Sequence, residues 1–205
     1  MKLYGYGTTP NPRKVKIVLA EKGIDYEMIE VDLYKGEHRS SEFIKMNPSG
    51  KVPVLETDDG KYLTESIAIC RYLEALHPEP NLFGTDAYEL GLIEMRNRQI
   101  ETELWSQIGT SWKNGPVVEK MGHRVVPEAK EISDANVYAY YERLNAELAE
   151  TEYLVAGRFT IADVTLITGV DFAIHNCALN PAESLENLWR WHKLITSRDS
   201  VDALA

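Results

Sequence analysis

Short apolar runs of strand length alternate with stretches of helical periodicity over the first 76 residues, in the order expected of an α/β domain. Strand patterns are predicted at residues 2–6, 26–31, 52–56 and 61–63. Helical patterns are predicted at residues 12–22, 41–46 and 65–76. The last two strands flank Asp58-Asp59-Gly60, a turn sequence that indicates a β-hairpin. Pro12 suits the first position of a helix and Gly23 suits the position just after its end.

Only helical periodicity continues after a proline-containing break that begins at His77. Val137, Tyr141, Leu144 and Leu148 recur at helical spacing and predict a buried stripe. Thr160-Ile161-Ala162-Asp163 has the form of a capping box, with Asp163 in place of the usual Glu. We therefore predict an α/β domain over residues 1–77, a linker over 78–85 and an all-helical domain over 86–205.

Composition and charge narrow the possible functions. The 205 residues are 44% hydrophobic and 26% charged, which is ordinary for a globular protein. The net charge of −10 argues against binding to nucleic acid or an anionic membrane, because binding to phosphates depends on clustered Lys and Arg. The start of the chain lacks the apolar stretch of a signal peptide, and no run of 18 apolar residues occurs, so a cytoplasmic location is expected.

The cysteines indicate neither a disulfide nor a metal site. Cys70 and Cys177 are far apart, and each lies in an apolar helical pattern. We expect both to be core residues, and we expect no metal and no cofactor.

Two short segments predict a cleft for a peptide-like ligand. Pro53 cannot donate in a ladder, so Val52-Pro53 is expected at a strand start, at an edge or across a cis bond. A cis bond there would turn the Val52 backbone outward, where an extended ligand could pair with it. Thr64 is predicted to cap the next helix, leaving the backbone N–H groups of Glu65 and Ser66 and the Ser66 hydroxyl free for a ligand carboxylate at the positive helix end. Each segment also has an ordinary interpretation, as a plain strand start or a plain helix cap.

The order of these motifs resembles that of the cytosolic glutathione transferases over nearly the whole chain. The resemblance implies a thioredoxin-like first domain followed by an all-helical second domain. It rests most strongly on residues 9–15, on residues 47–55 with Pro53, on Glu65-Ser66 and on residues 159–163.

The same resemblance assigns roles in binding glutathione. It implies that Val52 pairs with the cysteinyl backbone beside Pro53, and that Glu65 and Ser66 hold the γ-glutamyl end. His38 would reach the glycyl end, and Lys51 lies next to Val52 and is included in the site. Glutathione is thus expected as a co-substrate.

The loop before the first helix is expected to supply the group that contacts the sulfur. The position that the family uses for tyrosine, serine or cysteine is here Thr9, so Thr9 is predicted to donate to the thiolate with help from Asn11. This triplet resembles the bacterial nu class most closely, although serine-type classes such as theta or beta stay open. The alternative is that Thr8 or Thr9 caps its own loop. Tyr4 and Tyr6 fall inside the first predicted strand and are expected to be packed.

The resemblance predicts an enzyme that transfers the glutathione thiolate to a hydrophobic electrophile. The pocket for that second substrate is expected to include Gly7, Thr8, Trp105 and Trp112. Reduction of small disulfides with glutathione is one alternative, and a non-enzymatic interaction protein on the same scaffold is another. An isomerase of maleyl-type substrates is weaker, because its serine-serine-cysteine run is missing. A homodimer is expected.

Overall fold

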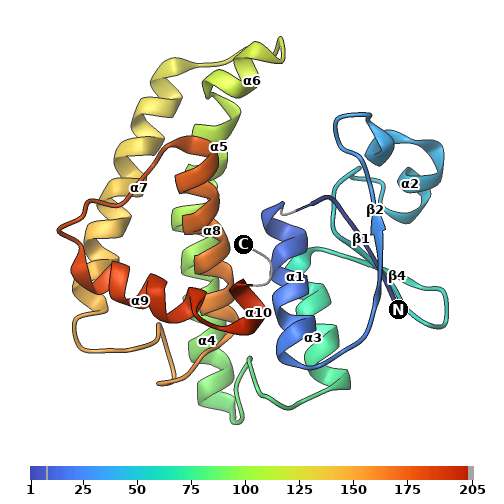
Figure 1. The fold of residues 1–205 in the computed structure, drawn as a ribbon, viewed down its shortest axis with the longest axis horizontal. Helices are drawn as coiled ribbons and strands as arrows, with labels where there is room; N and C mark the ends of the chain where they lie inside the picture. The colour runs from blue at the N-terminus through green and yellow to red at the C-terminus, as the bar shows by residue number, and fades with distance from the viewer. Residues whose placement is uncertain (8, 203–205) are drawn as a thin grey trace. The chain divides into compact units, whose positions relative to one another are not determined.

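The chain folds into two units in the computed structural model, which describes residues 1–7 and 9–202 (Figure 1). The first unit comprises residues 1–82 together with the segment that starts at Arg198. The second unit comprises Phe83–Ser197. The first unit carries the sheet and the second is helical, as the sequence pattern predicts.

A four-stranded mixed sheet forms the centre of the first unit. Its strands are β1 (Lys2–Gly5), β2 (Glu27–Glu30), β3 (Val54–Glu56) and β4 (Tyr62–Thr64), in the spatial order β2-β1-β3-β4. β1 and β2 are parallel, whereas β3 is antiparallel to both β1 and β4. The antiparallel pairing of β3 with β4 confirms the predicted hairpin.

Helices cover both faces of this sheet. They are α1 (Pro10–Glu21), the 3₁₀ turn η1 (Glu37–Arg39), α2 (Ser41–Met46) and α3 (Ser66–Leu76). The short α10 (Asp199–Asp202) packs against α1. α1 and α3 pack against each other on one side of the sheet (Figure 1). On the other side, Phe43 of α2 packs with Val31 and Val54, and Tyr4 and Val52 lie against this cluster.

Element boundaries differ from the prediction at two prolines. α1 starts at Pro10, so Pro12 is the third helical residue and not the first. Pro12 is still in the first turn, where its missing N–H leaves no helical bond unmade. β3 starts at Val54, and Val52-Pro53 is a cis peptide just outside the strand. Gly23 has φ +60° just after α1, which confirms it as the residue that ends the helix.

The second unit is built from helices of very different exposure. They are α4 (Ala87–Gln99), the π-helical stretch η2 (Ile100–Trp105), α5 (Ser106–Lys113), α6 (Pro116–Lys120), α7 (Pro127–Glu147), α8 (Ile161–Cys177) and α9 (Glu186–Thr196). α8 is buried over most of its length and packs against α4, α5 and α9. The predicted stripe of Val137, Tyr141, Leu144 and Leu148 is confirmed, since each of these side chains is at most 1% exposed.

The capping box at the start of α8 is also confirmed. The Asp163 carboxylate is fully buried and accepts the Thr160 backbone N–H at 3.0 Å. It also accepts the Trp191 indole N–H from α9 at 2.9 Å and the Leu154 N–H at 3.2 Å. Burial raises the pKa of this carboxyl. One side chain therefore joins the start of α8, the preceding loop and α9.

Gly169 of α8 lets the Trp105 ring lie directly on the helix. A Cβ added at Gly169 would be 3.0 Å from the indole Nε1, which donates to the Thr165 carbonyl at 2.9 Å. Gly169→Ala should therefore lower the free energy of unfolding by about 1–3 kcal/mol, since the indole must move. In contrast, Gly91→Ala in α4, where a Cβ meets no atom within 4 Å, should raise stability by about 0.5–1 kcal/mol. Urea unfolding of the pair checks both signs, and equal shifts would contradict the crowding at Trp105.

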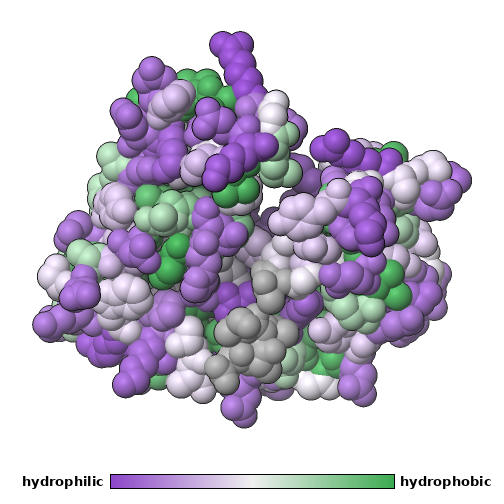
Figure 2. Space-filling model, turned by 45° about the horizontal axis from the view of Figure 1, so that its top comes forward, coloured by the Kyte–Doolittle hydropathy of each residue, from purple (hydrophilic) through white to green (hydrophobic). Residues whose placement is uncertain are grey.

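Surface and hydropathy features agree with the composition. None of the helices in the described part of the chain is long and apolar enough to span a bilayer. On the face in Figure 2, hydrophobic side chains are scattered among a majority of hydrophilic ones.

Candidate functional site

Most of the predicted site residues come together where β1 and β4 end and β3 begins. Tyr4 near the end of β1 pairs with Val54 at the start of β3, and Val54 pairs with Thr64 at the end of β4. The loop after β1, the segment before β3 and the segment after β4 must therefore meet at this end of the strands. Thr9, Val52-Pro53 and Glu65-Ser66 lie on these three segments. We call this region the strand-end site.

Asn47 holds the loop that leads into Val52. Its buried amide Nδ2 donates to the Lys51 carbonyl at 2.7 Å, and its Oδ1 accepts the backbone N–H of Ser49 at 3.1 Å. These bonds fix the turn before the cis Val52-Pro53 peptide. The Val52 side chain packs against the Phe43 cluster, so its backbone is anchored from both sides. A cis bond was among the alternatives that the sequence suggested.

The start of α3 differs from the prediction in its capping residue. Thr64 belongs to β4, and Glu65 is the N-cap, with no side-chain cap bond. Thr64 cannot cap the helix because its backbone pairs with Val54 in the sheet. Glu65 has φ +65°, a conformation that a non-glycine residue rarely adopts. The Glu65 side chain is exposed and Ser66 is buried at the first turn, which has no acidic residue.

Thr9 and Asn11 lie at the start of α1. The Thr9 hydroxyl donates to the Tyr6 carbonyl at 2.5 Å, and the Thr9 backbone N–H donates to the same oxygen at 3.0 Å. In this state the hydroxyl caps its own loop. Asn11 is exposed, and its Oδ1 accepts the Lys14 ammonium at 3.3 Å. With α3, two helix N-termini face the strand-end site, and both favour a negatively charged group there.

The backbone segments that carry His38 and Lys51 approach each other in the first unit. A Cβ added at Gly50 would be 3.2 Å from the His38 carbonyl, so η1 and the loop before β3 are in contact. The Lys51 side chain is exposed. The His38 Nδ1 is buried and has no hydrogen-bond partner within residues 1–7 and 9–202. The imidazole therefore has one ring nitrogen that is not used by the described protein groups.

Sequence reasoning missed an aromatic pair close to Thr9. β1 ends at Gly5, so Tyr6 is outside the strand and is partly exposed, contrary to the prediction that it is packed within it. Its ring meets Tyr34 edge to face, with 5.7 Å between the ring centroids. Tyr4, in contrast, is in the strand as predicted, and its hydroxyl donates to Glu56 at 2.6 Å. The Glu56 hydrogen bond, with burial, raises the pKa of Tyr4 to about 12.

The predicted second-substrate residues fall in both units. Gly7 is exposed in the first unit with φ +45°, and its N–H donates to Glu30 at 3.1 Å. Thr8 lies outside the described residues. In the second unit, Trp105 and Trp112 both contact Phe172, at centroid distances of 6.2 and 5.5 Å. No sequence pattern pointed to Phe172, because the apolar residues of α8 are not confined to one face of the helix.

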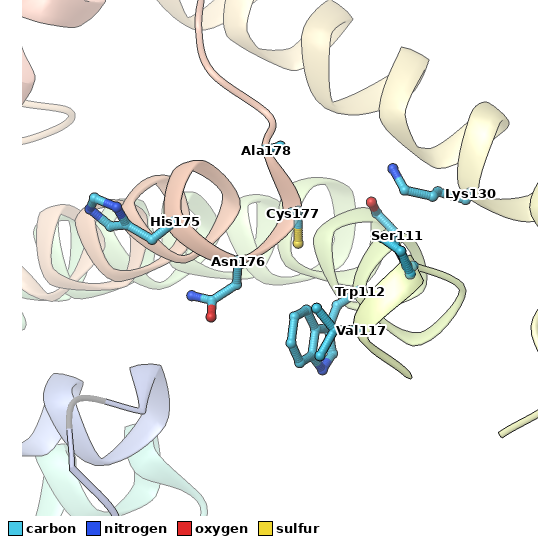
Figure 3. A pocket seen from close by; sticks show the side chains of 10 residues that line it. Ser111, Trp112, Val117, Lys130, His175, Asn176, Cys177 and Ala178 are labelled. Atoms are coloured by element: carbon cyan, nitrogen blue, oxygen red, sulfur yellow. The ribbon is translucent and has the colours of Figure 1, made fainter. Parts of the chain in front are cut away.

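Trp112 also lines a cavity of about 140 Å³ inside the helical unit (Figure 3). Its walls come from α5, α6, α7 and the end of α8, and its lining residues are Ser111, Trp112, Gly115, Pro116, Val117, Lys130, His175, Asn176, Cys177 and Ala178.

The two cysteines differ in environment. Cys70 is fully buried as predicted, and burial raises the pKa of its thiol to about 12. Cys177 was also expected in the core, but it is only partly buried because it ends α8 at the cavity wall. Burial raises the pKa of its thiol to about 11. Neither thiol belongs to the strand-end site.

Comparisons with known proteins cover both units. Residues 1–75 match the family model "Glutathione S-transferase, N-terminal domain", and residues 116–199 match "Glutathione S-transferase, C-terminal domain". The chain is 34% identical to "Glutathione S-transferase 2" of Saccharomyces cerevisiae over 211 aligned positions, which cover 100% of this chain and 89% of the relative.

Two further relatives differ in how much of this chain they match. The crystal structure of Gtt2 from Saccharomyces cerevisiae superposes with a TM-score of 0.90 at 33% identity, covering 100% of both chains. A "Maleylacetoacetate isomerase" of Pseudomonas aeruginosa is 43% identical, but over 88 residues that make up 42% of each chain.

Proposed function

Since this chain belongs to the glutathione S-transferase family, we propose that it binds reduced glutathione at the strand-end site and transfers the thiolate to a small hydrophobic electrophile. This proposal rests on one observation: Val52, Glu65-Ser66 and Thr9 lie on segments that meet at the same end of the strands. These groups can contact the backbone, one end and the sulfur of a single extended tripeptide.

Each part of glutathione finds a complementary group. The Val52 backbone can pair with the cysteinyl residue as an added strand. The Glu65 carboxylate can accept the γ-glutamyl ammonium, while the Ser66 hydroxyl and the start of α3 can hold its carboxylate. His38 and Lys51 lie on the side where the glycyl end would extend. The Lys51 ammonium suits a carboxylate, and the His38 ring can hydrogen-bond to it.

The site must stabilise the thiolate of bound glutathione relative to the thiol. A free thiol has a pKa near 8.5, and lowering it by about two units requires ~2.7 kcal/mol. A hydrogen bond to a charged group supplies about 1.5–3 kcal/mol, and a helix N-terminus adds ~0.3–1 kcal/mol. The Thr9 hydroxyl and the start of α1 together can meet this requirement. If the hydroxyl turns toward the sulfur, the Tyr6 carbonyl still accepts the Thr9 backbone N–H at 3.0 Å.

Thr9→Ala should lower turnover about ten-fold, because one hydrogen bond to the thiolate is lost. Thr9→Ser keeps a hydroxyl at the same position and should retain most of the activity. Glutathione affinity should change less than turnover in both variants. Steady-state kinetics with an aromatic halide as electrophile, together with the ultraviolet absorbance of bound thiolate against pH, measures both effects. Equal turnover of the alanine and serine variants at the wild-type level would remove Thr9 from the mechanism.

Calorimetric titration with reduced and with oxidised glutathione tests the function as a whole. Saturable binding of the reduced form, followed by conjugation of an electrophile, is the expected result. Tighter binding of the oxidised form with turnover of small disulfides would instead favour the reductase. No binding of either form would refute the proposal and favour an interaction protein.

We also propose a homodimer. Large hydrophobic side chains are exposed on the helical unit, among them Met95, Ile132 and Tyr138 at 50%, 64% and 43% exposure. Such side chains mark association surfaces when they lie close together. Light scattering after size exclusion should give twice the 23.3 kDa of one chain. A mass of 23.3 kDa across the working concentration range would contradict the dimer.

A further inference from the structure

Glu30, the last residue of β2, contacts the same peptide group that holds the Thr9 hydroxyl. The Glu30 Oε1 accepts the Gly7 N–H at 3.1 Å. The Tyr6 carbonyl belongs to the same peptide group as this N–H, and it accepts the Thr9 hydroxyl at 2.5 Å. The N–H and the carbonyl point in opposite directions because the peptide is trans. A chain of hydrogen bonds therefore runs from the Glu30 carboxylate through one peptide group to Thr9, entirely within the first unit.

The charge of Glu30 strengthens the hydrogen bond at the far end of this chain. Hydrogen bonds in series polarise one another, and a carboxylate is a stronger acceptor than a neutral group. The Tyr6 carbonyl therefore accepts the Thr9 hydroxyl more strongly than an unpolarised carbonyl would. A hydroxyl has one proton, so Thr9 cannot donate to this carbonyl and to a sulfur at the same time. Glu30 thus favours the state in which the Thr9 proton stays within the loop.

Lys16 holds the next peptide group of the loop. Its ammonium, in the second turn of α1, donates to the Gly7 carbonyl at 2.8 Å. Gly7 is therefore bonded at its N–H by Glu30 and at its carbonyl by Lys16. The Tyr6 ring also contacts Tyr34, with 5.7 Å between the ring centroids. These contacts fix the orientation of the peptide group that joins Tyr6 and Gly7.

We propose that Glu30 is a positioning residue that controls the proton of Thr9: its carboxylate keeps the hydroxyl on the Tyr6 carbonyl and so limits the stabilisation of the glutathione thiolate. This role rests on the proposed function, because it requires Thr9 to donate to the sulfur. When the bound thiol ionises, its proton leaves to solvent, and the Thr9 hydroxyl turns from the carbonyl to the sulfur. Glu30 opposes that turn, so removal of its charge should lower the pKa of the bound thiol.

Glu30→Gln tests this role, since it removes the charge and keeps an oxygen that can accept the Gly7 N–H. At a pH below the pKa of the bound thiol, we expect the thiolate fraction and the turnover to rise about two- to five-fold. The rise is small because Glu30 and Gly7 are exposed, so that solvent screens the charge. Ultraviolet absorbance of the bound thiolate against pH measures the first effect, and steady-state kinetics with an aromatic halide measures the second. A residue that only supports the loop would give the opposite sign, so unchanged or lower turnover would overturn the proposal.

Three comparisons isolate the path through Thr9. Glu27→Gln makes the same change of charge at an exposed position of the same strand, and it should alter neither quantity. In a Thr9→Ala background, Glu30→Gln should leave the thiolate fraction unchanged, because the group through which it acts is missing. Lys16→Met should lower turnover, because it loosens the loop without touching the peptide group that Glu30 contacts. A rise of equal size in the Thr9→Ala background would mean that Glu30 acts on the sulfur directly through its charge, and it would overturn the path.

The hydrogen-bond chain can also be tested without glutathione. The Thr9 backbone N–H donates to the same Tyr6 carbonyl at 3.0 Å. In Glu30→Gln its exchange with solvent, followed by NMR, should be about two- to five-fold faster, whereas Glu27→Gln should not change it. An unchanged Thr9 exchange rate in Glu30→Gln would overturn the inference. Faster exchange in a protein that binds no glutathione would refute the proposed function while supporting the hydrogen-bond chain from Glu30 to Thr9.

Discussion

Replacing Asp163 with alanine should lower the free energy of unfolding by about 3–5 kcal/mol, because four donors lose their acceptor at once. The backbone N–H groups of Thr160 and Leu154, the Thr160 hydroxyl and the indole N–H of Trp191 all donate to this buried carboxylate. An unpaired buried donor costs about 1–3 kcal/mol. Urea unfolding followed by far-ultraviolet circular dichroism measures the loss.

Asp86→Ala is a matched control for this experiment. Asp86 caps α4 by accepting the N–H groups of Tyr88 and Glu89, each at 2.9 Å, but it is exposed. Its loss should cost about 1 kcal/mol, the usual effect of an exposed N-cap. If Asp163→Ala costs no more than Asp86→Ala, the buried carboxylate does not hold the loop, α8 and α9 together. Combining Asp163→Ala with Trp191→Phe should be less than additive, because both changes remove the same hydrogen bond.

Glu65→Gln should weaken glutathione binding by about 10- to 100-fold, the loss of one charge-assisted hydrogen bond to the γ-glutamyl ammonium. The substitution keeps the shape of the side chain and removes its charge. Turnover at saturating glutathione should change little, because Glu65 is assigned to the end of the ligand that is remote from the sulfur. Calorimetry gives the affinity and steady-state kinetics give the turnover.

The positive φ of Glu65 calls for a second variant. Glu65→Gly fits φ +65° without a steric cost but has no carboxylate. It should bind glutathione as poorly as Glu65→Gln while being no less stable than the wild type. Glu131→Gln, at an exposed position of α7, should bind normally. Wild-type affinity in both Glu65 variants would mean that the carboxylate does not contact the ligand.

Local signals in the sequence were strong enough to predict much of the fold. Gly60 and its two neighbouring aspartates specify the hairpin of β3 and β4, and Gly23 ends α1 in the left-handed conformation. Thr160 and Asp163 specify the start of α8 because their hydrogen bond spans three residues. These features depend on short sequence separations, and a sequence pattern records such separations directly.

Features that depend on contacts across the fold could not be predicted. Thr64 has the side chain of a helix cap, but its pairing with Val54 keeps it in the sheet and moves the cap to Glu65. Whether the Thr9 hydroxyl donates to its loop or to a ligand depends on the position of the Tyr6 carbonyl. The contact of Phe172 with Trp105 joins helices far apart in the sequence.

A segment that begins at Arg198 completes the first unit. Arg198 binds Glu21 of α1 through two hydrogen bonds of 2.9 and 2.8 Å, and Ser200 donates to the same carboxylate. Burial alone would raise the pKa of Glu21, but these bonds hold it below its ordinary value. On the ribosome, residues 83–197 are made between Leu82 and Arg198, which takes roughly ten seconds at typical rates of synthesis. Glu21 therefore gains its partners Arg198 and Ser200 only after residues 83–197 have been made, so the first unit is completed after the second has been synthesised.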